Sequence, residues 1–212
     1  GKRPIDDPAA AKVVSHIYDA SEVGKQEYDI LFITNPTSTH YETLRQWAPY
    51  ARNVFIEKPV FDDPDQDLSA LPLRPDGVYY VACPLLYNPV LQYAKTRIDM
   101  TKVFSARAIC SSYLPDWRPG TDYRACYSAH KDMGGGVAID LVHEWDYLTW
   151  LMGFPQEVRY FGGTYSPLEI DSDDLAVYMG RYSNRIVELH LDYFGRRSQR
   201  TLELFTADEV IT

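Results

Sequence analysis

The chain has 212 residues, 45% of them hydrophobic, which is enough to bury a core as one large domain or two small ones. Its 21 basic and 30 acidic residues give a net charge of −9, which argues against binding to a nucleic-acid backbone. The longest apolar runs fall far short of the ~18 residues of a membrane span, and the start GKRPIDDPAA has no hydrophobic signal region. We therefore expect a soluble, cytoplasmic protein that binds neither nucleic acid nor membranes.

The cysteines agree with that location. Cys83, Cys110 and Cys126 are odd in number, lack the CxxC spacing and sit mostly among apolar neighbours. This pattern is typical of reduced thiols in a cytosolic protein and implies no disulfide framework.

The first clear β-strand is the continuous apolar run 29–34, a pattern typical of a strand covered on both faces in a parallel sheet. Before it, residues 11–18 predict only a short strand and residues 20–25 a helical turn. Asn35-Pro36 predicts a tight turn directly after the strand.

A helix and a second strand follow this turn. Thr39 and Glu42 have the S/T-x-x-E spacing of a capping box, so a helix is expected to start there and to run until Pro49. Residues 53–57 form a second short apolar run. Strand, helix and strand together predict a βαβ unit.

Two turns follow the two strands of this unit, Asn35-Pro36 and Glu57-Lys58-Pro59. Because parallel strands end at the same edge of a sheet, both turns are expected at the carboxyl edge, where open α/β sheets bind ligands. Glu57-Lys58-Pro59 alone would equally well form a surface turn, but the matching turn at Asn35 favours a site.

The middle of the chain indicates a domain boundary. Residues 60–76 are acidic and proline-rich and predict a connecting helix and loop, whereas residues 78–83 predict another strand. Residues 88–98 predict a helix with Pro89 in its first turn. We place the boundary between a first domain, 1–83, and a second domain, 84–212.

The sequence of the second domain predicts a β-sheet. Ser183-Asn184 indicates an antiparallel hairpin, and the apolar alternation before and after it requires a helix to cover one face. The basic cluster Arg196, Arg197 and Arg200 is interpreted as a solvated loop between strands. Five runs rich in β-branched and aromatic residues are expected to be strands: 102–111, 157–165, 175–182, 186–193 and 201–206.

The covering helix is expected over Gly134–Gly153, between a glycine run and a stop at Gly153 and Pro155. At helical spacing it has a polar face, either solvated or forming the wall of a cleft, and a core stripe. The polar face consists of Asp140, His143, Glu144 and Tyr147, and the core stripe of Leu141, Trp145, Leu148 and Met152. Because position 147 is Tyr, the histidine pair of a zinc helix is missing, and no metal is expected.

Arginines and aromatic residues gather in the segment 112–132. Such a mixture suits a polar ligand with a carboxylate, a phosphate or a sugar ring, although an ordered surface loop is the alternative. Its candidate substrate contacts are Trp117, Arg118, Tyr123 and Arg124.

The chain resembles the glucose-fructose oxidoreductase, inositol dehydrogenase and rhizopine-catabolism (Gfo/Idh/MocA) family of NAD(P)-dependent sugar oxidoreductases. The resemblance rests on motifs that follow one another in family order: DILFITNPTSTHYETL, FIEKPV, YNPVLQYAK and DMGGGVAIDLVHEWDYLTWLMG. The segment SSYLPDWRPGTDYR is also similar to a branch found with surface-polysaccharide sugar pathways.

This resemblance implies an α/β fold, with a partial Rossmann-like parallel sheet followed by an α+β domain that has an open-faced, largely antiparallel sheet. It implies NAD or NADP as cofactor, and a catalytic role for Lys58, next to a Lys-Pro peptide that is often cis. Asp140 and His143 would orient the substrate or relay a proton. The residues implied beside the cofactor are Asn35, Pro36, His40, Glu57 and Lys58; Tyr87 and Glu144 are implied as substrate contacts.

The sequence departs from the family pattern in three places. A GxGxxG loop is absent and the chain begins one or two strands late, so weak binding of NAD(P) is expected. The histidine stands three rather than four residues after Asp140, which leaves the choice between His143 and Glu144 open. Leu86 stands where a basic residue often precedes the tyrosine.

The function expected from the resemblance is hydride transfer between NAD(P) and a hydroxyl carbon of a sugar or nucleotide sugar. One alternative is an NAD-dependent glycoside hydrolase of the same family, and another is a non-catalytic sugar-binding or assembly module. The uncovered face of the second sheet is expected to pair in a homodimer or homotetramer.

Overall fold

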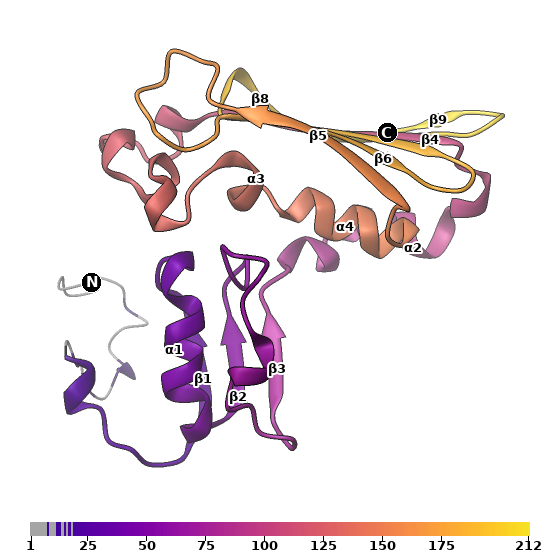
Figure 1. Ribbon diagram of the computed structural model, residues 1–212. Helices are drawn as coiled ribbons and strands as arrows, with labels where there is room; N and C mark the ends of the chain where they lie inside the picture. The colour runs from indigo at the N-terminus through magenta and orange to yellow at the C-terminus, as the bar shows by residue number, and fades with distance from the viewer. Residues whose placement is uncertain (1–7, 9–11, 14, 16, 18) are drawn as a thin grey trace.

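The computed structural model describes residues 8, 12, 13, 15, 17 and 19–212. In this part of the chain the strands form two sheets, one of three and one of six strands. Figure 1 shows a layer of helices, α3 and α4, that lies under the larger sheet and faces the smaller one. This layer brings side chains of both halves of the chain together.

The smaller sheet consists of β1 (Tyr28–Ile33), β2 (Ala51–Ile56) and β3 (Val78–Val81), all parallel and in that order. Helix α1 (His40–Trp47) connects β1 to β2 and buries Leu44 against Ile33 and Val54. The predicted strand-helix-strand unit is therefore confirmed, but the expectation that its first strand is covered on both faces was wrong, because Ile30 and Phe32 are 52% and 62% exposed. Both turns that follow β1 and β2 lie at the carboxyl edge of this sheet, as expected.

Details of this first part differ from the sequence interpretation. The expected capping box does not form, because Thr39 Oγ1 donates to the carbonyl of Pro36 at 2.7 Å and Glu42 pairs with Arg45 at 2.6 Å. The connecting helix expected within 60–76 is only a short 3-10 turn, Leu68–Ala70. The strand expected over 11–18 falls outside the continuously described part of the chain, which begins at residue 19.

The link between the two sheets contains α2 (Pro89–Arg97), capped by Asn88, whose side chain accepts from Val90 N at 2.9 Å. We propose the domain boundary at residues 83 and 84, between β3 and this helix.

The 3-10 helices of the described chain are η2 (Ala20–Glu22), η3 (Thr37–Thr39), η4 (Ala48–Tyr50), η5 (Leu68–Ala70), η6 (Pro84–Tyr87), η7 (Met100–Lys102), η8 (Leu114–Asp116), η9 (Tyr123–Ala125), η10 (Tyr127–Ala129) and η11 (Lys131–Met133).

The larger sheet has the strand order β5-β6-β7-β4-β8-β9. All neighbours are antiparallel except β4 and β7, so the expected largely antiparallel sheet is confirmed. The hairpin predicted at Ser183-Asn184 joins β6 to β7. The strands are β4 (Ser105–Tyr113), β5 (Glu157–Gly163), β6 (Leu175–Arg181), β7 (Ile186–Asp192), β8 (Phe194–Phe205) and β9 (Val210–Ile211).

The interpretation of Arg196, Arg197 and Arg200 as a loop was wrong, because all three belong to β8. Strand β8 begins at Phe194 rather than at residue 201, and Arg200 lies opposite Cys110 of β4. The ladder to β4 pairs Phe194 and residues 199–205, and Arg196 and Arg197 lie in an irregularity between them, so the segment is a strand even though its side chains are largely polar.

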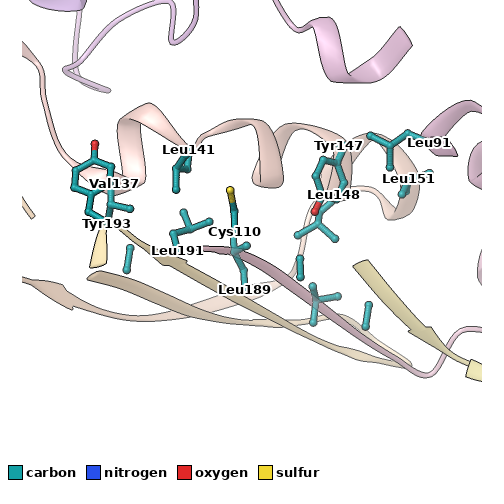
Figure 2. Packing of buried hydrophobic residues seen from close by; sticks show 14 of the residues in the cluster. Leu91, Cys110, Val137, Leu141, Tyr147, Leu148, Leu151, Leu189, Leu191 and Tyr193 are labelled. Carbon is teal, nitrogen blue, oxygen red and sulfur yellow. The ribbon is translucent and has the colours of Figure 1, made fainter. Parts of the chain in front are cut away.

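The segment Gly134–Gly153 forms two helices, α3 (Val137–Asp140) and α4 (His143–Met152), rather than one. Its polar face is not solvated: the exposed fractions are 4% for Asp140, 0% for Glu144 and 2% for Tyr147. Figure 2 shows Tyr147 and Leu148 among the apolar side chains that pack between α4 and the sheet. The two carboxylates tolerate this position because Tyr193 and Arg200 on the sheet donate to them.

The other face of the larger sheet carries charge at its centre. Arg107 on β4 lies between Glu188 on β7, at 3.2 Å, and Glu203 on β8, at 3.4 Å. Exposed Phe161 and Met179 lie on neighbouring strands. Among the described residues we found no helix with the length and hydropathy that a bilayer crossing requires.

Candidate active site

Lys58 stands directly after β2, at the carboxyl edge of the parallel sheet, and its peptide bond to Pro59 is cis, as the family resemblance implied. Its ammonium group reaches out of the first domain. Nζ donates a hydrogen bond of 2.6 Å to the backbone carbonyl of Asp140, at the end of α3. This contact joins the parallel sheet to the helical layer.

Two cavities meet at Lys58, which lines both of them together with Tyr127 of η10. The sheet-edge cavity, of about 330 Å³, is also lined by Thr34, Asn35, Pro36, Thr37, His40 and Glu57. The inner cavity, of about 410 Å³, is also lined by Cys110, Ser111, Ser112, Trp117, Asp140, Leu141, His143, Ser198, Gln199 and Arg200. The sequence-predicted candidates Lys58, Asp140 and His143 therefore line one common cavity.

The carboxylate of Asp140 is held by phenols. Tyr193 OH donates to its Oδ2 at 2.6 Å, and burial raises the pKa of Tyr193 well above its usual range. Burial, followed by the charge of Asp140 and a hydrogen bond to it, raises the pKa of Tyr127 to about 12. Both phenols therefore remain proton donors at neutral pH.

His143 is a neutral imidazole at physiological pH. Burial, followed by the positive charges of Lys58 and Arg200, lowers its pKa to about 4. Its Nδ1 is buried and has no hydrogen-bond partner among the described residues. A neutral ring that lines the inner cavity can exchange a proton with a bound hydroxyl.

Glu144 lies behind the inner cavity and is not one of its lining residues. Its Oε1 accepts from Arg200 Nε at 2.7 Å, and its side chain is fully buried. Burial raises the pKa of Glu144, whereas the adjacent guanidinium opposes that shift. The sequence left open whether His143 or Glu144 acts together with Asp140. In the structure His143 lines the cavity, whereas Glu144 accepts a hydrogen bond from Arg200.

His40 connects the two turns at the sheet edge. Its Nε2 lies 2.9 Å from the carbonyl of Asn35, and its Nδ1 lies 3.1 Å from the carbonyl of Pro59. The ring thus lines the sheet-edge cavity while both of its nitrogens face backbone carbonyls. Its contacts hold the Asn35-Pro36 turn against the segment of Lys58.

Two of the expected substrate contacts lie at or beside the inner cavity. Trp117 lines it, donates from Nε1 to Ser112 Oγ at 2.9 Å, and packs edge-on against Tyr193. Arg118 lies over the ring of Tyr127, with 5.4 Å between the guanidinium carbon and the ring centre.

Besides Glu144, three further expected contacts, Tyr87, Tyr123 and Arg124, lie outside both cavities. Tyr87 is 67% exposed, and its hydroxyl accepts a hydrogen bond of 3.1 Å from the hydroxyl of Tyr80. Arg124 pairs with Asp122 and Glu169, and the hydroxyl of Tyr123 accepts from Glu169 N at 3.2 Å. Tyr123 and Arg124 thus organise the loop, Tyr87 contacts β3, and none of the three lines the sheet-edge cavity or the inner cavity.

Sequence reasoning missed several residues of the site, above all Tyr127 and Arg200. Tyr127 was noticed only as part of an aromatic segment, and Arg200 was assigned to a solvated loop. The signal for Arg200 was a basic residue within a polar run that continues directly into the predicted strand 201–206. No group of three or more metal-binding side chains occurs in the described chain.

Residues 92–210 match the model of the GFO/IDH/MocA C-terminal domain. This match covers more than half of the chain. The chain therefore belongs to the GFO/IDH/MocA family, as the motifs indicated.

Two curated relatives are oxidoreductases without an assigned substrate. The chain is 25% identical over 130 residues to the uncharacterized oxidoreductase YrbE of Bacillus subtilis. This alignment covers 60% of this chain and 36% of YrbE. The chain is also 25% identical over 193 residues to an uncharacterized oxidoreductase of Streptococcus pneumoniae. This alignment covers 85% of this chain and 50% of that protein. The chain thus spans half or less of the length of these relatives.

Solved structures share the fold. A levoglucosan dehydrogenase in complex with NADH superposes with a TM-score of 0.71 at 20% identity, over 84% of this chain and 52% of that one. The WlbA dehydrogenase of Bordetella pertussis, in complex with NADH and UDP-GlcNAcA, superposes with a TM-score of 0.70 at 18% identity, over 85% and 57%. The fold class expected from the sequence is therefore confirmed.

Proposed function

We propose that this chain belongs to a dehydrogenase that moves a hydride between NAD or NADP and a hydroxyl-bearing carbon of a sugar or nucleotide sugar. The observation that supports this most strongly is the position of Lys58, which lines both the sheet-edge cavity and the inner cavity. A reaction between two bound molecules needs such a residue at the place where their sites meet.

The sheet-edge cavity fits the cofactor. It lies at the carboxyl ends of β1 and β2, where open α/β sheets bind dinucleotides, and Asn35, Thr37 and Glu57 give it polar walls. These residues would hold the end of NAD or NADP that takes part in the reaction. When bound, the cofactor supplies or accepts the hydride.

The inner cavity would then hold the sugar. Lys58 Nζ, oriented by the carbonyl of Asp140, would exchange a proton with the reacting hydroxyl. The neutral ring of His143 would accept or donate a hydrogen bond to the same or an adjacent hydroxyl. Asp140 and Tyr127 would hold the hydroxyls in place, and Trp117 would cover the sugar ring.

The comparisons support a sugar as substrate. The solved structures of the same fold include a levoglucosan dehydrogenase in complex with NADH and L-sorbose and the WlbA dehydrogenase in complex with NADH and UDP-GlcNAcA. Residues 111–124 resemble a branch of the family found with surface-polysaccharide sugar pathways, which supports a nucleotide sugar. We further propose a cytoplasmic location and a homodimer or homotetramer assembled through the outer face of the larger sheet.

The test is a screen of the intact natural protein for sugar-dependent NADH or NADPH formation. Free sugars, uronic acids and nucleotide sugars are each supplied with NAD or NADP, and cofactor absorbance is followed. Reduction of the cofactor in step with oxidation of one sugar is expected. Release of sugar from a glycoside without net NADH would favour the hydrolase instead, and binding of sugars without any turnover would favour the binding module.

A further inference from the structure

Arg200 is a charged side chain of the inner cavity that the proposed reaction does not use. It stands on β8 opposite Cys110, and its guanidinium lies on the wall of the inner cavity. We propose that Arg200, held in place by Glu144, is a binding subsite for an oxyanion carried by the substrate. The inference rests on the proposed function in one respect, that the inner cavity holds the substrate.

The ion pair fixes the orientation of the guanidinium. Nε of Arg200 donates to Glu144 Oε1 at 2.7 Å, and no other hydrogen bond from this guanidinium to an oxygen occurs among the described residues. Glu144 is fully buried, whereas 47% of the Arg200 side chain is exposed. The buried carboxylate of Glu144 therefore holds Nε of the guanidinium. The terminal Nη1 and Nη2 groups can donate hydrogen bonds to a ligand.

The surroundings of Arg200 suit an anion. The inner cavity is lined by two cationic side chains, Lys58 and Arg200, and by one carboxylate, Asp140, to which Tyr193 already donates. After burial, the same two cations lower the pKa of His143, because both charges lie close to its ring. Glu144, behind the cavity wall, balances part of the Arg200 charge, so a negative group of the substrate would be attracted mainly by Lys58 and by the terminal N–H groups of Arg200 that Glu144 does not bind.

Small polar groups next to Arg200 complete the subsite. Ser111, Ser198 and Gln199 line the cavity with hydroxyl and amide groups that can donate to the remaining oxygens of an anion. A planar guanidinium binds a carboxylate or a phosphate through two parallel hydrogen bonds. The substrate class is thus an acidic sugar, either a uronic acid or a sugar phosphate.

The experiment measures binding to the intact natural protein by calorimetry, with D-glucuronate, D-glucose 6-phosphate and neutral D-glucose as probes. At least one of the two acidic probes should bind at least about tenfold more tightly than D-glucose, a factor that corresponds to about 1.4 kcal/mol. Preference for D-glucuronate identifies a carboxylate site, and preference for D-glucose 6-phosphate identifies a phosphate site.

The variants test whether Arg200 causes the preference. Arg200→Gln leaves Glu144 buried without its partner, so the double variant Arg200→Gln/Glu144→Gln is measured beside it, after its fold has been checked by circular dichroism. Both should bind the acidic probe no more tightly than D-glucose. Arg197→Gln, on the same strand and away from both cavities, is the matched control and should keep the preference.

Equal affinity of the natural protein for all three probes would overturn the proposal, as would failure of both acidic probes to bind at about 10 mM. A preference that survives in the folded double variant would overturn it too. Calorimetry needs no turnover, so it tests the subsite separately from the reaction. If the protein never reduces NAD or NADP but shows a preference for acidic probes that depends on Arg200, the proposed dehydrogenase function is refuted and the proposed anion subsite is supported.

Discussion

Lys58 Nζ and the backbone carbonyl of Asp140 are joined by a hydrogen bond of 2.6 Å across 82 positions of the chain. One residue ends a strand of the parallel sheet and the other ends α3, so the contact brings the sheet edge to the helical layer. Asp140 therefore meets Lys58 through its main chain, while its carboxylate is held by Tyr193.

Removal of the Arg200 charge should raise the pKa of His143. The value of about 4 results from burial first, and then from Lys58 and Arg200. In Arg200→Gln burial and Lys58 remain, so the pKa should rise but stay below the ordinary value of about 6.5. Two-dimensional NMR of the imidazole against pH measures it; an unchanged pKa would show that Arg200 does not act on the cavity.

His143 should also make stability depend on pH. Its pKa in the folded state, about 4, lies below its unfolded value of about 6.5, so the unfolded chain binds more protons between these values. The free energy of unfolding should therefore fall as the pH drops from about 6.5 towards 4. Urea denaturation across this range tests this, and in His143→Gln the slope should be smaller; an identical slope would contradict the assignment.

Tyr193→Phe should destabilise the protein more than Tyr182→Phe. Both buried phenols donate one hydrogen bond, Tyr193 to the carboxylate of Asp140 at 2.6 Å and Tyr182 to the carbonyl of Gly153 at 2.9 Å. Hydrogen bonds to charged groups are worth about 1.5–3 kcal/mol, against about 0.5–1.5 kcal/mol for neutral ones. Thermal unfolding compares the two variants, and equal losses would mean that Asp140 does not depend on this phenol.

Gly135→Ala should disturb the segment that carries Tyr127. A Cβ atom there would lie 2.2 Å from the carbonyl oxygen of Tyr127 and 2.7 Å from that of His130, and backbone cannot yield as a flexible side chain does. We expect a loss of about 2 kcal/mol or more in unfolding free energy. Gly24→Ala is the control, because its nearest contact would be an ordinary 3.8 Å; similar stability of both variants would refute this close packing.

Periodicity and turn residues predicted the elements that follow local rules. The continuous apolar run 29–34 and the turns at Asn35 and Lys58 placed the parallel sheet and its carboxyl edge correctly. The family motifs, rather than periodicity, indicated that Lys58 and Asp140 belong to one site. Their meeting depends on how two halves of the chain pack, which local sequence does not encode.

The misjudged residues show where such rules fail. Helical spacing placed Glu144 and Tyr147 on a polar face, either solvated or forming the wall of a cleft, yet both are buried, and Arg200 on a distant strand pairs with Glu144 there. Arg200 itself was read as part of a loop because its polar run lacks the alternation of a half-buried strand. A long-range ion pair thus accompanies the burial of Glu144, and pairing with β4 places Arg200 in a strand.

Replacement of Lys58 by Met in the intact natural protein tests the proposed catalytic centre most directly. Met retains most of the stem volume but removes the group that exchanges the proton, so kcat with the true substrate should fall about 10²- to 10⁴-fold while the affinity for NAD or NADP changes little. Asp140→Asn should also lower kcat, and the double variant should lose less than the product of the two effects, because both residues act on one hydroxyl. A kcat of Lys58→Met within a few-fold of the parent would contradict the catalytic role of Lys58 and favour a binding module.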